Sequence, residues 1–110
     1  MALAFEVASD EFTFDTFQPG EGQPPHVHNV SFGENRVQNA WAILQGFDLH
    51  YQGSHDHHVL RESVNLYTGI SLSSLGTVDV TIEILLRDGS GNIDDPYAGK
   101  ITFLVIADLA

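Results

Sequence analysis

Apolar and polar residues alternate with a period of two along most of the chain. The alternation is clearest in residues 41–51, 60–66 and 78–86, where large apolar side chains recur on one alternating set of positions. In an extended strand, such a period places successive side chains on opposite faces, and β-branched residues are concentrated in the last of these segments. No segment has the spacing of an amphipathic helix of useful length. The pattern therefore predicts an all-β protein.

Short segments of turn-forming residues separate the predicted strands, and they are rich in glycine, proline, asparagine and serine. They lie at residues 19–25, 33–35, 53–54, 73–76 and 88–97. Six or seven strands joined by such turns in 110 residues fit an antiparallel β-sandwich, with a small barrel as the alternative. We expect one domain, in which residues 24–110 form the sandwich and residues 1–23 form an N-terminal strand or arm.

The last predicted strand, residues 101–109, is apolar on both of its faces. One alternating set starts at Ile101 and Phe103, and the other contains Leu104 and Ile106. A small sandwich buries only the face that is turned toward its own core. We therefore expect the second face to be covered either by the first segment of the chain or by another subunit.

The composition argues against several classes of function. The chain has 15 acidic and 4 basic residues, and the formal net charge of −11 would repel a nucleic-acid backbone or an anionic membrane. No apolar run approaches the ~20 residues that span a bilayer, so we expect neither a nucleic-acid partner nor membrane insertion. The absence of cysteine excludes disulfides and thiolate chemistry. No nucleophile elbow, metalloprotease helix or carboxylate pair stands out, so we predict that the protein is not an enzyme.

The first residues contain neither the basic region nor the apolar core of a secretory signal. The composition is that of a soluble globular protein, and both a cytoplasmic and a secreted location stay open.

Several short motifs in the second half resemble the H-type lectin domain, the sugar-binding β-sandwich of snail agglutinins and slime-mould discoidins. The resemblance covers roughly residues 24–109. It is carried by an apolar strand that ends in Gly-Phe-Asp-Leu at residues 46–49, by a Leu-Arg pair at residues 60–61, and by an Ile-Ala pair at residues 106–107.

The resemblance implies a six-stranded antiparallel sandwich that forms homo-trimers or hexamers and binds galactose-type sugars in clefts between subunits. By position, it implies a role for Arg61 and for Tyr97, which closes the last loop. Family members with sugar activity usually have a tryptophan and then a polar residue in that loop, whereas this chain has Arg87 and Asp88. Because sugar hydroxyls need both a donor and an acceptor, we expect Arg61, Asp88 and Tyr97 to form the carbohydrate site.

Without the tryptophan ring, a sugar loses a stacking platform. The alternative function is therefore a structural or assembly domain of a larger particle or appendage that binds no sugar.

The six histidines suggest a third function, a module that binds a transition metal. Two side chains separated by one residue on a strand project to the same side, as in the pairs His26/His28 and His55/His57. Neutral imidazole is a common ligand of zinc, nickel and copper. A closed site needs three or four converging ligands, and a solvated histidine-rich loop is the competing interpretation.

Residues 88–97 raise the same question for calcium. Oxygen-bearing side chains occur at every second position, namely at Asp88, Ser90, Asn92 and Asp94. This spacing is similar to the first half of a calcium loop, but the glutamate at the twelfth position is missing. A polar, glycine-rich turn between strands explains the same residues. We expect no required cofactor, with calcium or a transition metal as possible ligands.

Overall fold

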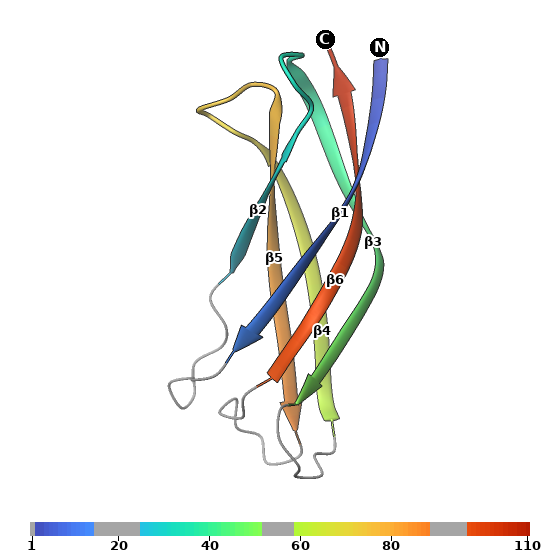
Figure 1. The fold of residues 1–110 in the computed structure, drawn as a ribbon, viewed down its shortest axis with the longest axis vertical. Coiled ribbons are helices and arrows are strands. Elements are labelled where there is room, and N and C mark those ends of the chain that lie inside the picture. Colours follow the sequence, from blue (N-terminus) through green and yellow to red (C-terminus); the bar gives the residue numbers. More distant parts are fainter. Residues whose placement is uncertain (1, 15–24, 52–58, 89–96) are drawn as a thin grey trace.

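The protein is an antiparallel β-sandwich of two three-stranded sheets, which confirms the predicted fold class (Figure 1). The computed structural model describes residues 2–14, 25–51, 59–88 and 97–110. Its strands are β1 (Ala2–Phe14), β2 (His26–Ser31), β3 (Val37–Tyr51), β4 (Val59–Ile70), β5 (Thr77–Asp88) and β6 (Tyr97–Leu109). No helix occurs in these residues, and consequently none that could cross a membrane.

The strand order is β1-β6-β3 in one sheet and β2-β5-β4 in the other. β1 pairs with β6 along its whole length, from Ala2 opposite Leu109 to Phe14 opposite Tyr97. The N-terminal segment is therefore an edge strand within a sheet. The boundary that we expected near residue 23 lies outside the described residues. The central strands β5 and β6 have a neighbour on each side, which agrees with their high content of β-branched and other apolar residues.

The core lies between the sheets, and its buried residues come from β2, β3, β5 and β6, with partly buried residues of β1 and β4 packed against them. The inward positions of β5 and β6 are the most deeply buried, and Phe103 at the centre is 0% exposed. The core residues are Val30, Val37, Val78, Val80, Ile82, Ile84, Ile101, Phe103, Val105 and Ala107. The alternation in the sequence thus corresponds to burial in the structure.

One end of the sandwich is closed by backbone hydrogen bonds between two turns. The N–H of Phe32 donates to the carbonyl oxygen of Gly76 at 2.8 Å, and the N–H of Val37 donates to that of Leu75 at 2.8 Å. The turn after β2 places Gly33 at a φ of 80°, a conformation that favours glycine. A Cβ added at Gly76 would lie only 2.1 Å from the carbonyl oxygen of Gly33, so this close approach requires glycine at position 76.

Candidate functional site

The three residues expected to bind carbohydrate lie near the same end of the sandwich. Arg61 is opposite Arg87 on the neighbouring strand, and Asp88 is the last residue of β5. Tyr97 is the first residue of β6 in the other sheet. The end of β5 and the start of β6 lie at the lower end of the molecule in Figure 1, close to the start of β4. The side chains of these three residues are not among those described.

The other predicted ligands, Ser90, Asn92, Asp94, His55 and His57, lie outside the described residues. The described part of the chain holds no group of three or more histidine, aspartate or glutamate side chains that could bind a metal ion. Metal binding by residues 52–58 and 88–96 therefore stays a prediction.

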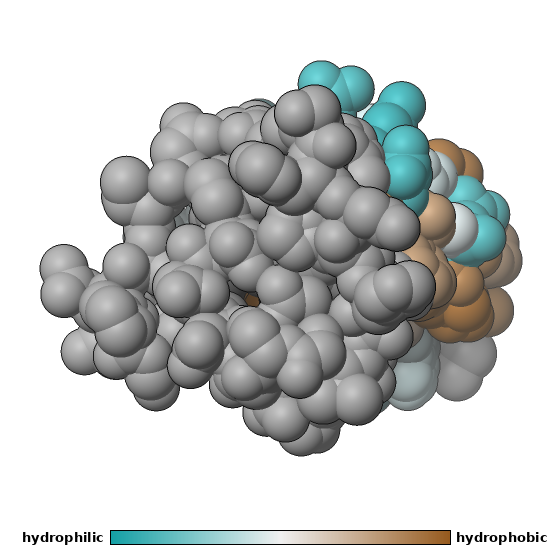
Figure 2. Space-filling view, turned by 90° about the horizontal axis from the view of Figure 1, so that it is seen from below, coloured by the Kyte–Doolittle hydropathy of each residue, from teal (hydrophilic) through white to brown (hydrophobic). Residues whose placement is uncertain are grey.

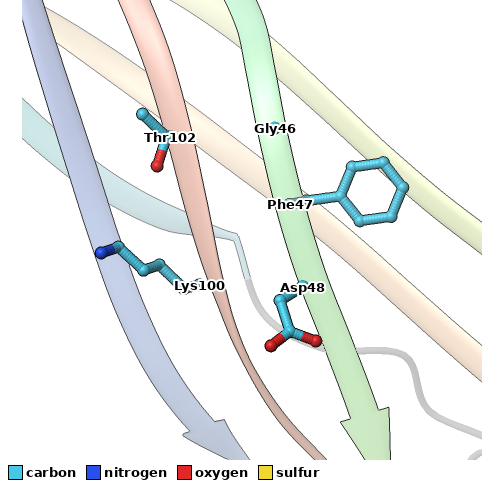
Figure 3. A pocket seen from close by; sticks show the side chains of 5 residues that line it. All are labelled: Gly46, Phe47, Asp48, Lys100 and Thr102. Carbon is cyan, nitrogen blue, oxygen red and sulfur yellow. The ribbon is translucent and has the colours of Figure 1, made fainter.

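An open pocket lies on the β1-β6-β3 sheet, where β3 and β6 run side by side (Figure 3). It has a volume of about 280 Å³ and is lined by Gly46, Phe47, Asp48, Lys100 and Thr102. The pairing of β3 with β6 shifts between Leu44 and Gly46, so that Gly46 lies opposite Thr102 and Asp48 lies opposite Lys100. A Cβ added at Gly46 would meet nothing within 4 Å, so the missing side chain contributes to the hollow.

The side chains around this pocket combine a hydrogen-bond acceptor, a cationic donor and a hydroxyl group. In Figure 3 the Lys100 side chain extends toward β1 rather than toward Asp48, and the Phe47 ring extends away from β6 on the other side of β3. The pocket is thus lined by more apolar than polar surface, and its polar side chains are Asp48, Lys100 and Thr102. An acceptor and donors around one hollow can orient a small polar molecule.

Sequence reasoning did not assign Asp48, Lys100 or Thr102 to a site, although Asp48 belongs to the motif at residues 46–49. Two signals could have found them. Lys100 is the only lysine of an acidic chain, and Gly46 interrupts an apolar strand, where a glycine often marks a bulge or the close approach of a ligand. Neither signal reveals that these residues lie opposite each other on neighbouring strands, because that depends on the register between β3 and β6.

The same sheet carries an apolar surface on the side that faces away from the core. Leu104 and Ile106 of β6 alternate with fully buried core residues and are only partly buried. Their partners on β1 and β3 continue the apolar character across the sheet. We call this surface the outer apolar face, and it consists of Leu3, Phe5, Val7, Trp41, Ile43, Leu104 and Ile106. Seen from below, Figure 2 shows apolar surface on the side of the molecule where β3 lies, with hydrophilic residues beside it.

Three polar side chains meet between the edge strands β1 and β2, which belong to different sheets. Oδ2 of Asp10 lies 2.8 Å from Nε2 of His26 and 3.8 Å from Nδ1 of His28. Oδ2 is buried, and the short contact does not have hydrogen-bond geometry, so the attraction depends on a protonated imidazole. The His28 ring also meets Phe103 edge-on, with 5.5 Å between ring centroids. This cluster bridges one open side of the sandwich.

The opposite side of the sandwich is bridged by an uncharged contact. The hydroxyl group of Thr68 on β4 donates a hydrogen bond of 3.0 Å to the carbonyl oxygen of Ala40 on β3.

A comparison of the chain with models of protein families, with curated proteins and with solved structures finds no match.

Proposed function

We propose that the protein is a non-enzymatic carbohydrate-binding module that works as a homo-oligomer. The observation that carries the binding part is the pocket over Gly46, where Asp48, Lys100 and Thr102 lie beside apolar surface. Sugar hydroxyls both donate and accept hydrogen bonds, so an uncharged sugar can use the carboxylate, the ammonium and the hydroxyl group together. A polyanionic ligand is disfavoured by the net charge of −11.

The pocket also lies near the residues that the lectin resemblance implies. Lys100 follows Tyr97 by three positions on β6, which corresponds to about 10 Å along a strand. On β3, Asp48 precedes Tyr51, the residue that pairs with Tyr97. One ligand-binding end of the sandwich could therefore include the pocket together with Arg61, Asp88 and Tyr97, and longer glycans would reach both parts.

Glycan screening followed by calorimetry tests the binding proposal, with galactose-type sugars, in calcium and in a chelator. Gly46→Val fills the hollow and Lys100→Ala removes its cation, and we expect each to weaken binding at least about tenfold. Asp79→Asn on the other sheet serves as the control, because Asp79 lies on β5 outside the pocket. Asp88→Ala tests separately whether the last residue of β5 takes part in glycan binding. If the wild type binds no glycan in either condition, the proposed carbohydrate function is wrong.

The second candidate function is a structural or assembly domain that binds no sugar, and the outer apolar face favours it. Such a surface serves self-association equally well with or without a ligand. The resemblance leads us to expect trimers or hexamers. Light scattering on the purified protein gives the mass, and a multiple of 12.1 kDa without any glycan binding would support this function over the first.

A further inference from the structure

We infer that the outer apolar face of the β1-β6-β3 sheet is covered by a second copy of this chain. The inference rests on the homo-oligomer part of the proposed function and specifies the surface that is used. It does not depend on sugar binding.

The large apolar side chains of this face are more exposed than is usual for a surface that remains in contact with water. Phe5 is 60% exposed and Val7 is 61% exposed, although both lie opposite apolar residues of the central strand. On the other edge strand, Trp41 and Ile43 are 49% and 50% exposed. Isolated exposed apolar residues are common on proteins, but a continuous group across three strands marks an interaction surface.

The other sheet shows what a solvated face of this protein looks like. Its outward positions include Asp79 and Glu83 on β5, with Asn29 and Asn65 on the neighbouring strands. The two sheets share one core, but among the described residues only the β1-β6-β3 sheet carries a continuous apolar group on its outer side. On the other sheet, Thr81 separates the exposed Val27 and Tyr67. The described N-terminal segment extends this sheet at its edge and leaves the outer side open, so a partner has to cover it.

The distribution of charge favours a second copy as that partner. Two copies that each carry a net charge of −11 repel each other, and they can approach only where carboxylates are scarce. On the outer side of the β1-β6-β3 sheet, charged residues occupy the ends and not the middle. Glu11, Asp48 and Lys100 lie toward one end of this side, and the buried Asp108 lies opposite Leu3 at the other. The outer apolar face itself contains no charged side chain.

The size of the face agrees with a stable interface between copies. Five of its residues are about half exposed or more, and they contribute roughly 400–500 Å² of accessible surface, given the usual size of aromatic and aliphatic side chains. A standard interface buries about 800 Å² per partner, of which somewhat more than half is apolar. A second copy would thus cover about as much apolar surface as a typical partner does.

The N-terminal strand depends most on this partner. Among the described side chains of β1, the inward Ala4 and Ala8 are small, whereas the larger Leu3, Phe5 and Val7 point outward. These three side chains therefore become buried only when a second copy covers the face.

Charge substitutions on the two outer faces provide the decisive experiment. Ile43→Glu and Val7→Glu place a carboxylate in the outer apolar face, and Val27→Glu places one on the outer side of the other sheet at a matched exposure of 51%. Light scattering at micromolar concentration should show an oligomer for the wild type and for Val27→Glu. The two outer-face variants should have the 12.1 kDa mass of one chain, or at least a tenfold higher dissociation constant.

The fluorescence of Trp41 provides a second readout on the unaltered protein, which is needed if a variant does not fold. Trp41 is the only tryptophan and lies in the outer apolar face. Dilution should shift its emission to longer wavelengths as copies separate, at the concentration where the mass falls. A wild type that is monomeric throughout, or an oligomer that dissociates without any change in Trp41 emission, would overturn the inference. Glycan binding by such a monomer would leave the carbohydrate proposal standing.

Discussion

Replacing Phe103 by alanine tests whether the two sheets pack as tightly as the structure shows. The side chain is 0% exposed, lies at the centre of β6 and contacts the edge of the His28 ring. Truncation of a fully buried phenylalanine removes its transfer free energy and leaves a cavity, which together cost about 3–5 kcal/mol. With an unfolding entropy of about 2.1 cal/mol/K per residue over 110 residues, each kcal/mol corresponds to about 4 °C. We therefore expect the melting temperature to fall by roughly 12–20 °C.

Urea unfolding followed by far-ultraviolet circular dichroism measures this loss, with wild type and variant at the same protein concentration. Val7→Ala is the control, because Val7 is 61% exposed on the outer apolar face. In dilute monomer, Val7→Ala should change the free energy of unfolding by no more than about 0.5 kcal/mol. A loss below about 1.5 kcal/mol for Phe103→Ala would mean that this side chain is not enclosed by the two sheets, and the assignment of the core would be wrong.

Two further substitutions test other parts of the fold. Gly76→Ala would push a Cβ against the carbonyl oxygen of Gly33, so it should cost at least about 2 kcal/mol of unfolding free energy. Gly69→Ala is the control, because a Cβ at Gly69 meets nothing within 4 Å and the substitution should be nearly neutral. Asp10→Asn removes the carboxylate oxygen that lies 2.8 Å from Nε2 of His26. Because the His26 side chain is 53% exposed, the substitution should cost at most about 1 kcal/mol of unfolding free energy, and a loss above about 2 kcal/mol in urea unfolding would contradict this account.

The period of two was sufficient to predict the all-β sandwich, because burial follows the same period in the strands that form the core. β6 shows this most directly, since one alternating set of its side chains lies in the core and the other lies on the outer apolar face. The sequence left open whether the first segment covers that second face. The alternation of β1 does not reveal which edge it joins, because the pairing of the first strand with the last is a long-range contact.

The pocket over Gly46 was not predictable for a related reason. Asp48 and Lys100 are separated by more than fifty residues, and they lie opposite each other in the sheet only because the β3–β6 register shifts between Leu44 and Gly46. The contact of Asp10 with His26 likewise joins edge strands of different sheets. The histidine pair was noticed in the sequence as a possible metal ligand, but nothing in the sequence indicated that a carboxylate from β1 lies beside it.

The central position of β6 determines the order in which the chain can fold. β1 and β3 both pair with β6, which is synthesised last of the six described strands, so neither can enter its sheet until the ribosome has nearly finished this segment. β2, β4 and β5 form their sheet without β6, but half of the core is then missing. Closing such distant contacts is slow, in the range of milliseconds to seconds for β-sandwiches of this size. During that interval the apolar side chains of β1 remain unpaired, so chains released before β6 is complete should aggregate rather than fold.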